Sequence, residues 1–237
     1  MEELEATVEA IRARLEIRNQ ARDQALQHSR QLIRFCANAI RATHRLEQEI
    51  ARHLLGEARQ IGRQLLETVR EHGDLYHAGY TQDAFKELAE AHITYALING
   101  QPLPKPEDLG VEDAAYLNGL GEATGELRRH ALDLIRQGNV ARAEVILQVM
   151  DEIYSQLIAV DFPDAVTGSL RRTTDMVRGV VERTRGDLTT AVRQEQLEQA
   201  LGNLEKRMQG PWSAGATLPP DREQASSDPE KRWQGEP

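Results

Sequence analysis

The chain has 237 residues, a formal net charge of −9 at pH 7, 28% charged residues and only 4% aromatic residues. This excess of acid excludes a protein that binds nucleic acid through its overall charge, so such binding would require a local basic surface. The only cysteine, Cys36, excludes an intrachain disulfide, and we expect it to be a buried, reduced thiol because apolar residues surround it.

Helix-forming residues dominate the composition, and the first seventy residues predict two helices. Residues 2–47 and 48–70 contain no proline and only two glycines, and apolar residues recur among them at helical spacing. The sequence His72-Gly73-Asp74 then predicts a stop followed by a new helix cap.

The remaining elements follow from breaker residues. A third helix is expected over 81–98, and it is ended by Asn99-Gly100 and three prolines. A fourth is expected over 112–138 and a fifth over 140–160, with a break at the Asp-Phe-Pro-Asp sequence that follows. The last is expected over 166–208, and we allow for an interruption at Gly186.

The pattern predicts an all-α protein, a bundle of six or seven long antiparallel helices in one domain over 1–208. Residues 209–237 are rich in proline, glycine and serine and predict a disordered tail. A leucine series near the end of the last helix, at Leu197, Leu201 and Leu204 and continuing to Met208, indicates a core or a subunit seam.

No apolar run approaches the roughly 20 residues that span a membrane. The acidic start, MEELEATVEA, also lacks a signal-peptide pattern. We therefore expect a soluble, cytoplasmic protein with no membrane partner.

Two expected helices carry paired glutamates. Glu87 and Glu90 are three residues apart, and Glu122 and Glu126 are four apart, so each pair shares a helix face. If the two faces met inside the bundle, the carboxylates would repel each other unless a hard cation lay between them. Oxygen ligands of this kind suit Mg²⁺ or Mn²⁺, and a bound ion could activate water for attack on a phosphodiester.

A simpler interpretation of the carboxylates stays open. Acidic helix faces are usually solvated surface, and Glu126 can pair with Arg129 or His130 on its own helix.

Four arginines of the first helix form a ridge. Arg30, Arg34, Arg41 and Arg45 fall within about 60° of one another on a helical wheel, with His44 nearby. Such a ridge can bind phosphates, with weak sequence preference and steep salt dependence because aromatic stacking residues are few. The alternative is that these arginines pair with glutamates on neighbouring helices.

The segment YLNGLGEATGELRRHALDL (116–134) places three glycines inside a leucine periodicity. Glycine in a helix interior costs about 1 kcal/mol relative to alanine. The glycines therefore indicate that something packs closely against this helix, or binds there.

Four separated segments, in order, resemble the translin family of nucleic-acid-binding proteins, which comprises translin and translin-associated factor X. The resemblance spans about residues 5–205. The segments are SRQLIRFCANAIRATHR (29–45), FKELAEAHITYAL (85–97), YLNGLGEATGELRR (116–129) and DFPDAVTGSLRRTTDMVRGVVERTRGDLT (161–189).

The resemblance implies an all-α protein that assembles into a hollow homo-oligomer, commonly an octamer, and binds single-stranded or structured RNA and also single-stranded DNA. In translin-associated factor X, acidic residues on two helices form a magnesium-dependent endoribonuclease site, whereas translin is mainly a binding and scaffolding subunit. The matching positions here are Glu87, Glu90, Glu122 and Glu126. Catalytic members carry aspartate where this chain has Glu122, and binding members also carry the glutamate at Glu126.

Three functions follow from these observations. The first is an RNA-binding oligomer with Mg²⁺-dependent endoribonuclease activity, in which Glu87, Glu90 and Glu122 hold the metal and Glu126 supports them. The second is a non-catalytic single-strand-binding oligomer in which the carboxylates are structural. The third is a helical scaffold for protein partners.

Overall fold

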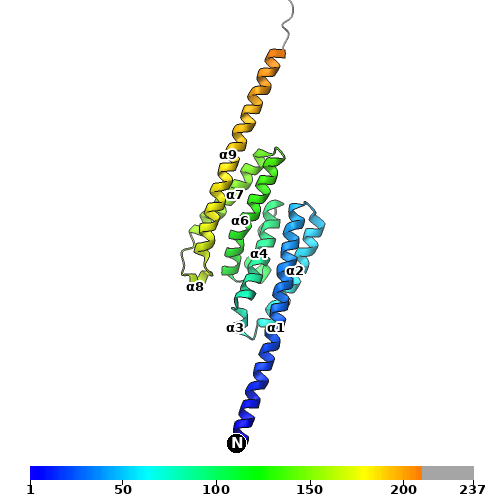
Figure 1. The fold of residues 1–237 in the computed structure, drawn as a ribbon, viewed down its shortest axis with the longest axis vertical. Helices are drawn as coiled ribbons and strands as arrows, with labels where there is room; N and C mark the ends of the chain where they lie inside the picture. Colours follow the sequence, from blue (N-terminus) through cyan, green and yellow to red (C-terminus); the bar gives the residue numbers. More distant parts are fainter. Residues whose placement is uncertain (210–237) are drawn as a thin grey trace, which may run out of the picture. The chain divides into compact units, whose positions relative to one another are not determined.

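The computed structural model describes residues 1–209, and within this range every regular element is a helix. Six helices are long: α1 (Glu2–His44), α2 (Gln48–Val69), α4 (Gly79–Ile98), α6 (Asp113–Arg136), α7 (Val140–Ile158) and α9 (Leu170–Gln209). Three have a single turn: α3 (Gly73–Tyr76), α5 (Pro106–Leu109) and α8 (Asp164–Thr167). The predicted all-α bundle is confirmed (Figure 1).

Local backbone geometry explains where the helices differ from the expected ranges. The last long helix begins at Leu170 instead of residue 166, because Gly168 and Ser169 have φ values of 59° and 66° and end α8. These left-handed angles are easy for glycine and strained for serine. The same helix passes through Gly186 without a break, so no interruption occurs there.

The chain divides into two units, Met1–Gln194 and Glu195–Pro237. In the first unit, α1 packs on α2 and α4, α4 packs on α6, and α6 packs on α7. Figure 1 shows this succession of neighbouring helices. Because α4 is covered by α1 on one side and α6 on the other, 12 of its 20 residues are buried.

Cys36 of α1 is buried, as predicted. Burial chiefly, and then the charges of Glu87 and Glu90, raise the pKa of its thiol. The thiol therefore stays protonated and unreactive, and the charges of the two glutamates of α4 add to the effect of burial.

The first part of α1 carries an apolar stripe that no other part of residues 1–209 covers. Leu4, Val8, Ile11 and Leu15 are all exposed. Each lies three heptads before a buried residue of the same helix. These buried residues are Ala25, Ser29, Leu32 and Cys36. The face that packs into the bundle thus continues, uncovered, toward the N-terminus.

The second unit is described only up to residue 209. Its leucine series, Leu197, Leu201, Leu204 and Met208, is exposed, so it forms no core with the described residues, and the subunit seam remains the prediction. The predicted tail lies outside the described residues, apart from its first residue. None of the helices over residues 1–209 is long and apolar enough to cross a membrane.

Candidate metal centre and basic ridge

The first pair of predicted carboxylates, Glu87 and Glu90, lies on α4. Their spacing of three residues places both on one side of the helix. Glu90 is buried, with only 9% of its surface exposed, and Glu87 is partly buried. A glutamate is rarely buried to this extent without a partner, which marks this face of α4 as unusual.

Gly119 explains how α6 reaches this face. A β-carbon at Gly119 would lie 2.7 Å from the backbone oxygen of Lys86, 2.9 Å from the β-carbon of Ala89 and 3.0 Å from the backbone nitrogen of Glu90. Only glycine permits such an approach between the two helices. The close approach places Glu122, one turn further along α6, beside α4.

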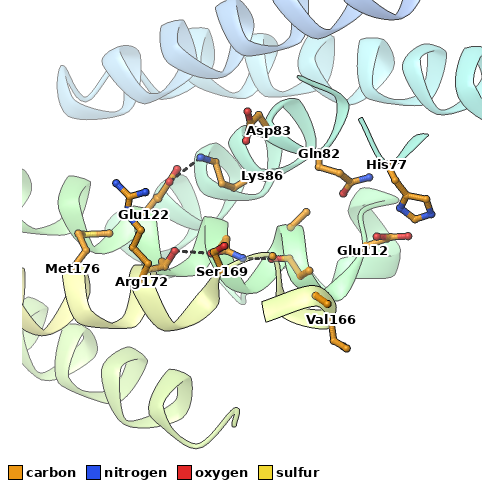
Figure 2. A pocket seen from close by; sticks show the side chains of 16 residues that line it. His77, Gln82, Asp83, Lys86, Glu112, Glu122, Val166, Ser169, Arg172 and Met176 are labelled. Atoms are coloured by element: carbon orange, nitrogen blue, oxygen red, sulfur yellow. Dashed lines mark hydrogen bonds and ion pairs between the residues drawn. The ribbon is translucent and has the colours of Figure 1, made fainter. Parts of the chain in front are cut away.

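Lys86 is the partner of Glu122. Its Nζ donates a hydrogen bond to Glu122 Oε1 at 2.8 Å (Figure 2). Burial lowers the pKa of Lys86, but the hydrogen bond and charge of Glu122 outweigh this effect, so the pKa is raised. The ammonium group therefore stays charged beside the cluster.

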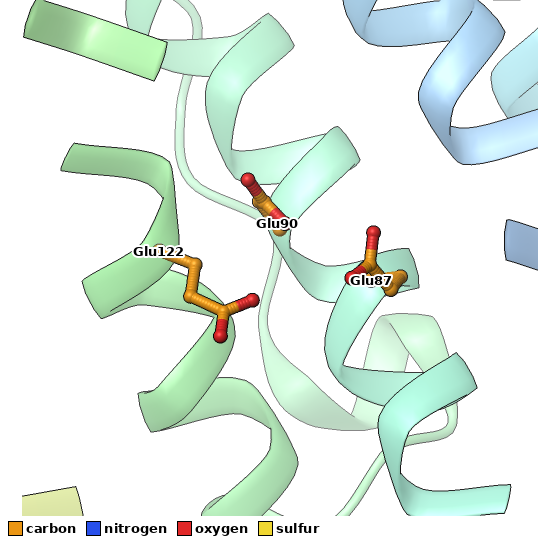
Figure 3. A group of neighbouring side chains, drawn as sticks. All are labelled: Glu87, Glu90 and Glu122. Atoms are coloured by element: carbon orange, nitrogen blue, oxygen red, sulfur yellow. The ribbon is translucent and has the colours of Figure 1, made fainter. Parts of the chain in front are cut away.

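Glu87, Glu90 and Glu122 converge. One carboxylate oxygen from each residue lies within 4.8 Å of the others. Figure 3 shows Glu122 extending from α6 toward the two glutamates of α4. The glutamate side chain at residue 122 reaches the cluster.

The cluster has excess negative charge. Burial, followed by the charges of Glu87 and Glu122, raises the pKa of Glu90 to about 8. Burial also raises the pKa of Glu87, with Lys86 opposing it and Glu122 adding to it. Three carboxylates against one lysine are held together at an electrostatic cost, which a divalent cation would offset.

The donor set fits magnesium. All three candidate ligands are carboxylate oxygens, which Mg²⁺ and Mn²⁺ prefer, and no histidine or cysteine joins them. Among residues 1–209, no other group of three or more acidic, histidine or cysteine side chains is arranged to share a metal ion.

Glu126 has a different partner. His44 Nε2 lies 2.5 Å from Glu126 Oε2, and the His44 side chain is only 2% exposed. This hydrogen bond, against the opposing effect of burial, lowers the pKa of Glu126. The i,i+3 pair of Glu126 with Arg129 that the sequence suggested is present at 4.0 Å, and it is longer than the contact with His44. Glu126 therefore ties α6 to α1 and lies outside the group of three.

The four predicted arginines, three in α1 and Arg45 directly after it, are exposed, whereas the side chain of His44 is buried. Arg41 donates to Asn38 at 2.6 Å and Arg45 pairs with Glu47 at 2.9 Å. Arg30 and Arg34 have no ion pair among the described residues. The basic ridge, defined here as Arg30, Arg34, Arg41 and Arg45, is therefore open to solvent, whereas the imidazole of His44 is turned inward to Glu126.

Sequence reasoning missed two contributors to the site. Lys86 neighbours Glu87 in the chain, but nothing in the spacing shows that it reaches Glu122 on another helix. The pairing of His44 with Glu126 joins residues 82 positions apart. Gly119 is one of the three glycines that the sequence places in α6. The structure gives a packing reason to it and to Gly121, whose β-carbon would lie 2.3 Å from Thr173 Cγ2, whereas Gly125 faces open space.

Comparisons with known proteins place the chain. No protein-family model matches it. The uncharacterized protein MJ0175 of Methanocaldococcus jannaschii is 27% identical over 193 residues, covering 79% of this chain and 84% of that protein.

Among solved structures, AfC3PO in complex with duplex RNA is 35% identical, covers 78% of this chain and 96% of its own, and has a TM-score of 0.68. AfC3PO alone is 34% identical with the same coverage and a TM-score of 0.72. NeC3PO, at 19% identity and a TM-score of 0.72, shows the shared fold alone. C3PO is the complex of translin and translin-associated factor X, and the chain belongs to this translin family.

Proposed function

We propose that this protein is an oligomeric RNA-binding endoribonuclease that requires Mg²⁺ or Mn²⁺. The observation that carries the proposal is the convergence of Glu87, Glu90 and Glu122 within 4.8 Å, with a single lysine beside them. The similarity to AfC3PO, which was solved with duplex RNA, supports an RNA substrate. Family resemblance supports an octamer and extends the ligands to single-stranded RNA and DNA.

The three carboxylates would hold the metal ion. When bound, Mg²⁺ supplies positive charge that favours ionised water and offsets charge developing on the phosphate. Lys86 holds Glu122 in position and supplies a further positive charge beside the phosphate. Glu126, fixed by His44, keeps α6 against α1 and supports the placement of Glu122.

The basic ridge would hold the RNA backbone. Exposed guanidinium groups bind phosphates with two parallel hydrogen bonds, and binding of this kind weakens steeply with salt. The ridge carries no aromatic platform beyond Phe35, over which Arg34 lies at 5.9 Å. Weak sequence preference follows, because phosphate contacts carry no base information.

A non-catalytic RNA-binding or DNA-binding oligomer is the second candidate. It is favoured by the hydrogen bonds that Glu122 and Glu126 already make to Lys86 and His44. In that case the carboxylates would serve as structural acceptors between helices.

A cleavage assay separates the two. Purified protein is incubated with a 5′-labelled single-stranded RNA in Mg²⁺ and in EDTA, beside the double variant Glu87→Gln, Glu90→Gln. The matched control is Glu144→Gln, Glu152→Gln, which removes the same charge from exposed positions of α7. We expect cleavage by the wild type and the control in Mg²⁺, and none in EDTA or by the cluster variant.

Cleavage that persists in EDTA and in the cluster variant would reveal a contaminant and end the catalytic proposal. Binding with no cleavage by any protein would favour the non-catalytic oligomer.

For the ridge, Arg30→Gln with Arg34→Gln should flatten the slope of log affinity against log salt by about 1.4, given roughly 0.7 per phosphate contact on a single strand. An affinity independent of salt would contradict the ridge.

A further inference from the structure

A cavity of about 650 Å³ opens beside the carboxylate cluster. It lies between α4, α6, α8 and the start of α9, all within the first unit (Figure 2). Glu122 and Lys86 line it, so one wall of the cavity is also the edge of the candidate metal centre. A ligand in the cavity would therefore lie next to the candidate metal centre.

Arg172 is the cation of the cavity that has no ion pair among the described residues. Lys86 is committed to Glu122, whereas Arg172 of α9 is exposed and lies on the same side of the cavity as Glu122 in Figure 2. An unpaired guanidinium at the mouth of a cavity fits an anionic ligand, and its planar fork matches a phosphate group.

Apolar side chains also line the cavity, with Met176 beside Arg172 and Glu122 and Val166 on the other side (Figure 2). Val166 of α8 is 67% exposed and Met176 of α9 is 38% exposed, and both line the cavity. Exposed apolar groups beside a cation suit a ligand that carries a flat apolar face and a phosphate. A nucleotide combines the two, and a cavity of this volume is within the usual range for a small ligand.

Asn118 lines the cavity, and its side chain is hydrogen-bonded within the protein. Asn118 Nδ2 donates to the backbone oxygens of Ala114 and Thr167, both at 2.8 Å, and Thr173 Oγ1 donates to Asn118 Oδ1 at 2.6 Å. One amide proton is used within α6 and the other joins α6 to α8, while Thr173 of α9 donates to the amide oxygen. The amide protons of Asn118 are thus unavailable to read a base.

We propose that this cavity binds one unpaired nucleotide that flanks the scissile phosphate, with Arg172 holding the nucleotide's phosphate and Val166 and Met176 contacting its base or ribose. The inference rests on the proposed endoribonuclease function. A nucleotide can enter only when its base is unstacked and unpaired, as bases are when proteins splay out single strands. The site therefore favours single strands or ends over a blunt duplex.

Arg171 provides a matched control for Arg172. It is the preceding residue and is also exposed, but it lines a different cavity near Phe162. Fluorescence anisotropy would measure binding of a labelled eight-nucleotide single-stranded RNA, and of a blunt RNA duplex, in EDTA. We expect Arg172→Ala to weaken single-strand binding about tenfold, the loss of one charge-assisted hydrogen bond, and Arg171→Ala to leave it unchanged.

Arg172→Lys should fall between the wild type and Arg172→Ala, because it keeps the charge and loses the bidentate fork. Duplex binding should be the same for all proteins. Equal single-strand affinities for Arg172→Ala, Arg171→Ala and wild type would overturn the inference, as would an equal loss on duplex RNA. Because binding is measured without metal or cleavage, this result is independent of whether the protein proves catalytic.

Discussion

Replacement of Gly119 by alanine tests how α6 brings Glu122 to the cluster. The new β-carbon would lie 2.7 Å from a backbone oxygen and 3.0 Å from a backbone nitrogen of α4. These atoms belong to a buried helix and cannot rotate away as the end of a flexible side chain can. The two helices must therefore move apart.

The size of the effect follows from the contacts. Relief of the 2.7 Å contact to an ordinary separation of about 3.5 Å requires a movement of roughly 0.8 Å. Overpacking of this kind costs about 1–3 kcal/mol, against the roughly 1 kcal/mol by which alanine favours a helix over glycine. The net free energy of unfolding should fall by up to about 2 kcal/mol.

Gly125→Ala is the matched control, on the same helix with nothing within 4 Å of its added β-carbon. It gains the same helical propensity without the clash, so the clash alone separates the two variants, by about 1–3 kcal/mol in unfolding free energy. Thermal unfolding should place Gly119→Ala roughly 2–12 °C below Gly125→Ala, at about 2–4 °C per kcal/mol for a chain of this size.

The same movement separates Glu122 from Glu87 and Glu90. Titration calorimetry with Mn²⁺ should therefore give weaker binding for Gly119→Ala than for Gly125→Ala. Equal melting temperatures and equal Mn²⁺ affinities for the two variants would refute the argument that close helix approach builds the site.

Two further predictions concern pH and assembly. In EDTA, the free energy of unfolding should fall as pH rises from about 4.5 to about 8. The reason is that Glu90 has a pKa of about 8 in the folded protein and keeps a proton that the unfolded chain releases. Glu90→Gln should flatten this pH dependence, measured by urea unfolding, and an unchanged slope would contradict the assignment. The double variant Val8→Glu, Ile11→Glu places charge on the exposed apolar stripe of α1 and should lower the oligomer mass measured by light scattering. The control Ala6→Glu, Ala13→Glu places the same charge on the opposite face of α1 and should leave the mass unchanged. Equal masses for the two variants would exclude the stripe from assembly.

Local sequence determined the helices. Helical periodicity, the Asn99-Gly100 turn and the proline-rich connection each act within a few residues, so they could be interpreted without the fold. The same holds for Glu87 and Glu90, whose shared face depends only on helical spacing. The short α8, by contrast, depends on positive φ values at Gly168 and Ser169 that the serine gave no reason to expect.

Tertiary structure decided what the carboxylates do. Spacing could not show that Gly119 approaches α4 while Gly125 faces open space, because that depends on which side of α6 meets its neighbour. Nor could it show that His44, one residue from the ridge arginine Arg45, turns inward to Glu126. The sequence by itself determined which residues share a helix face; only the packing of α4 against α6 decided which faces meet, because that contact joins residues far apart in the chain.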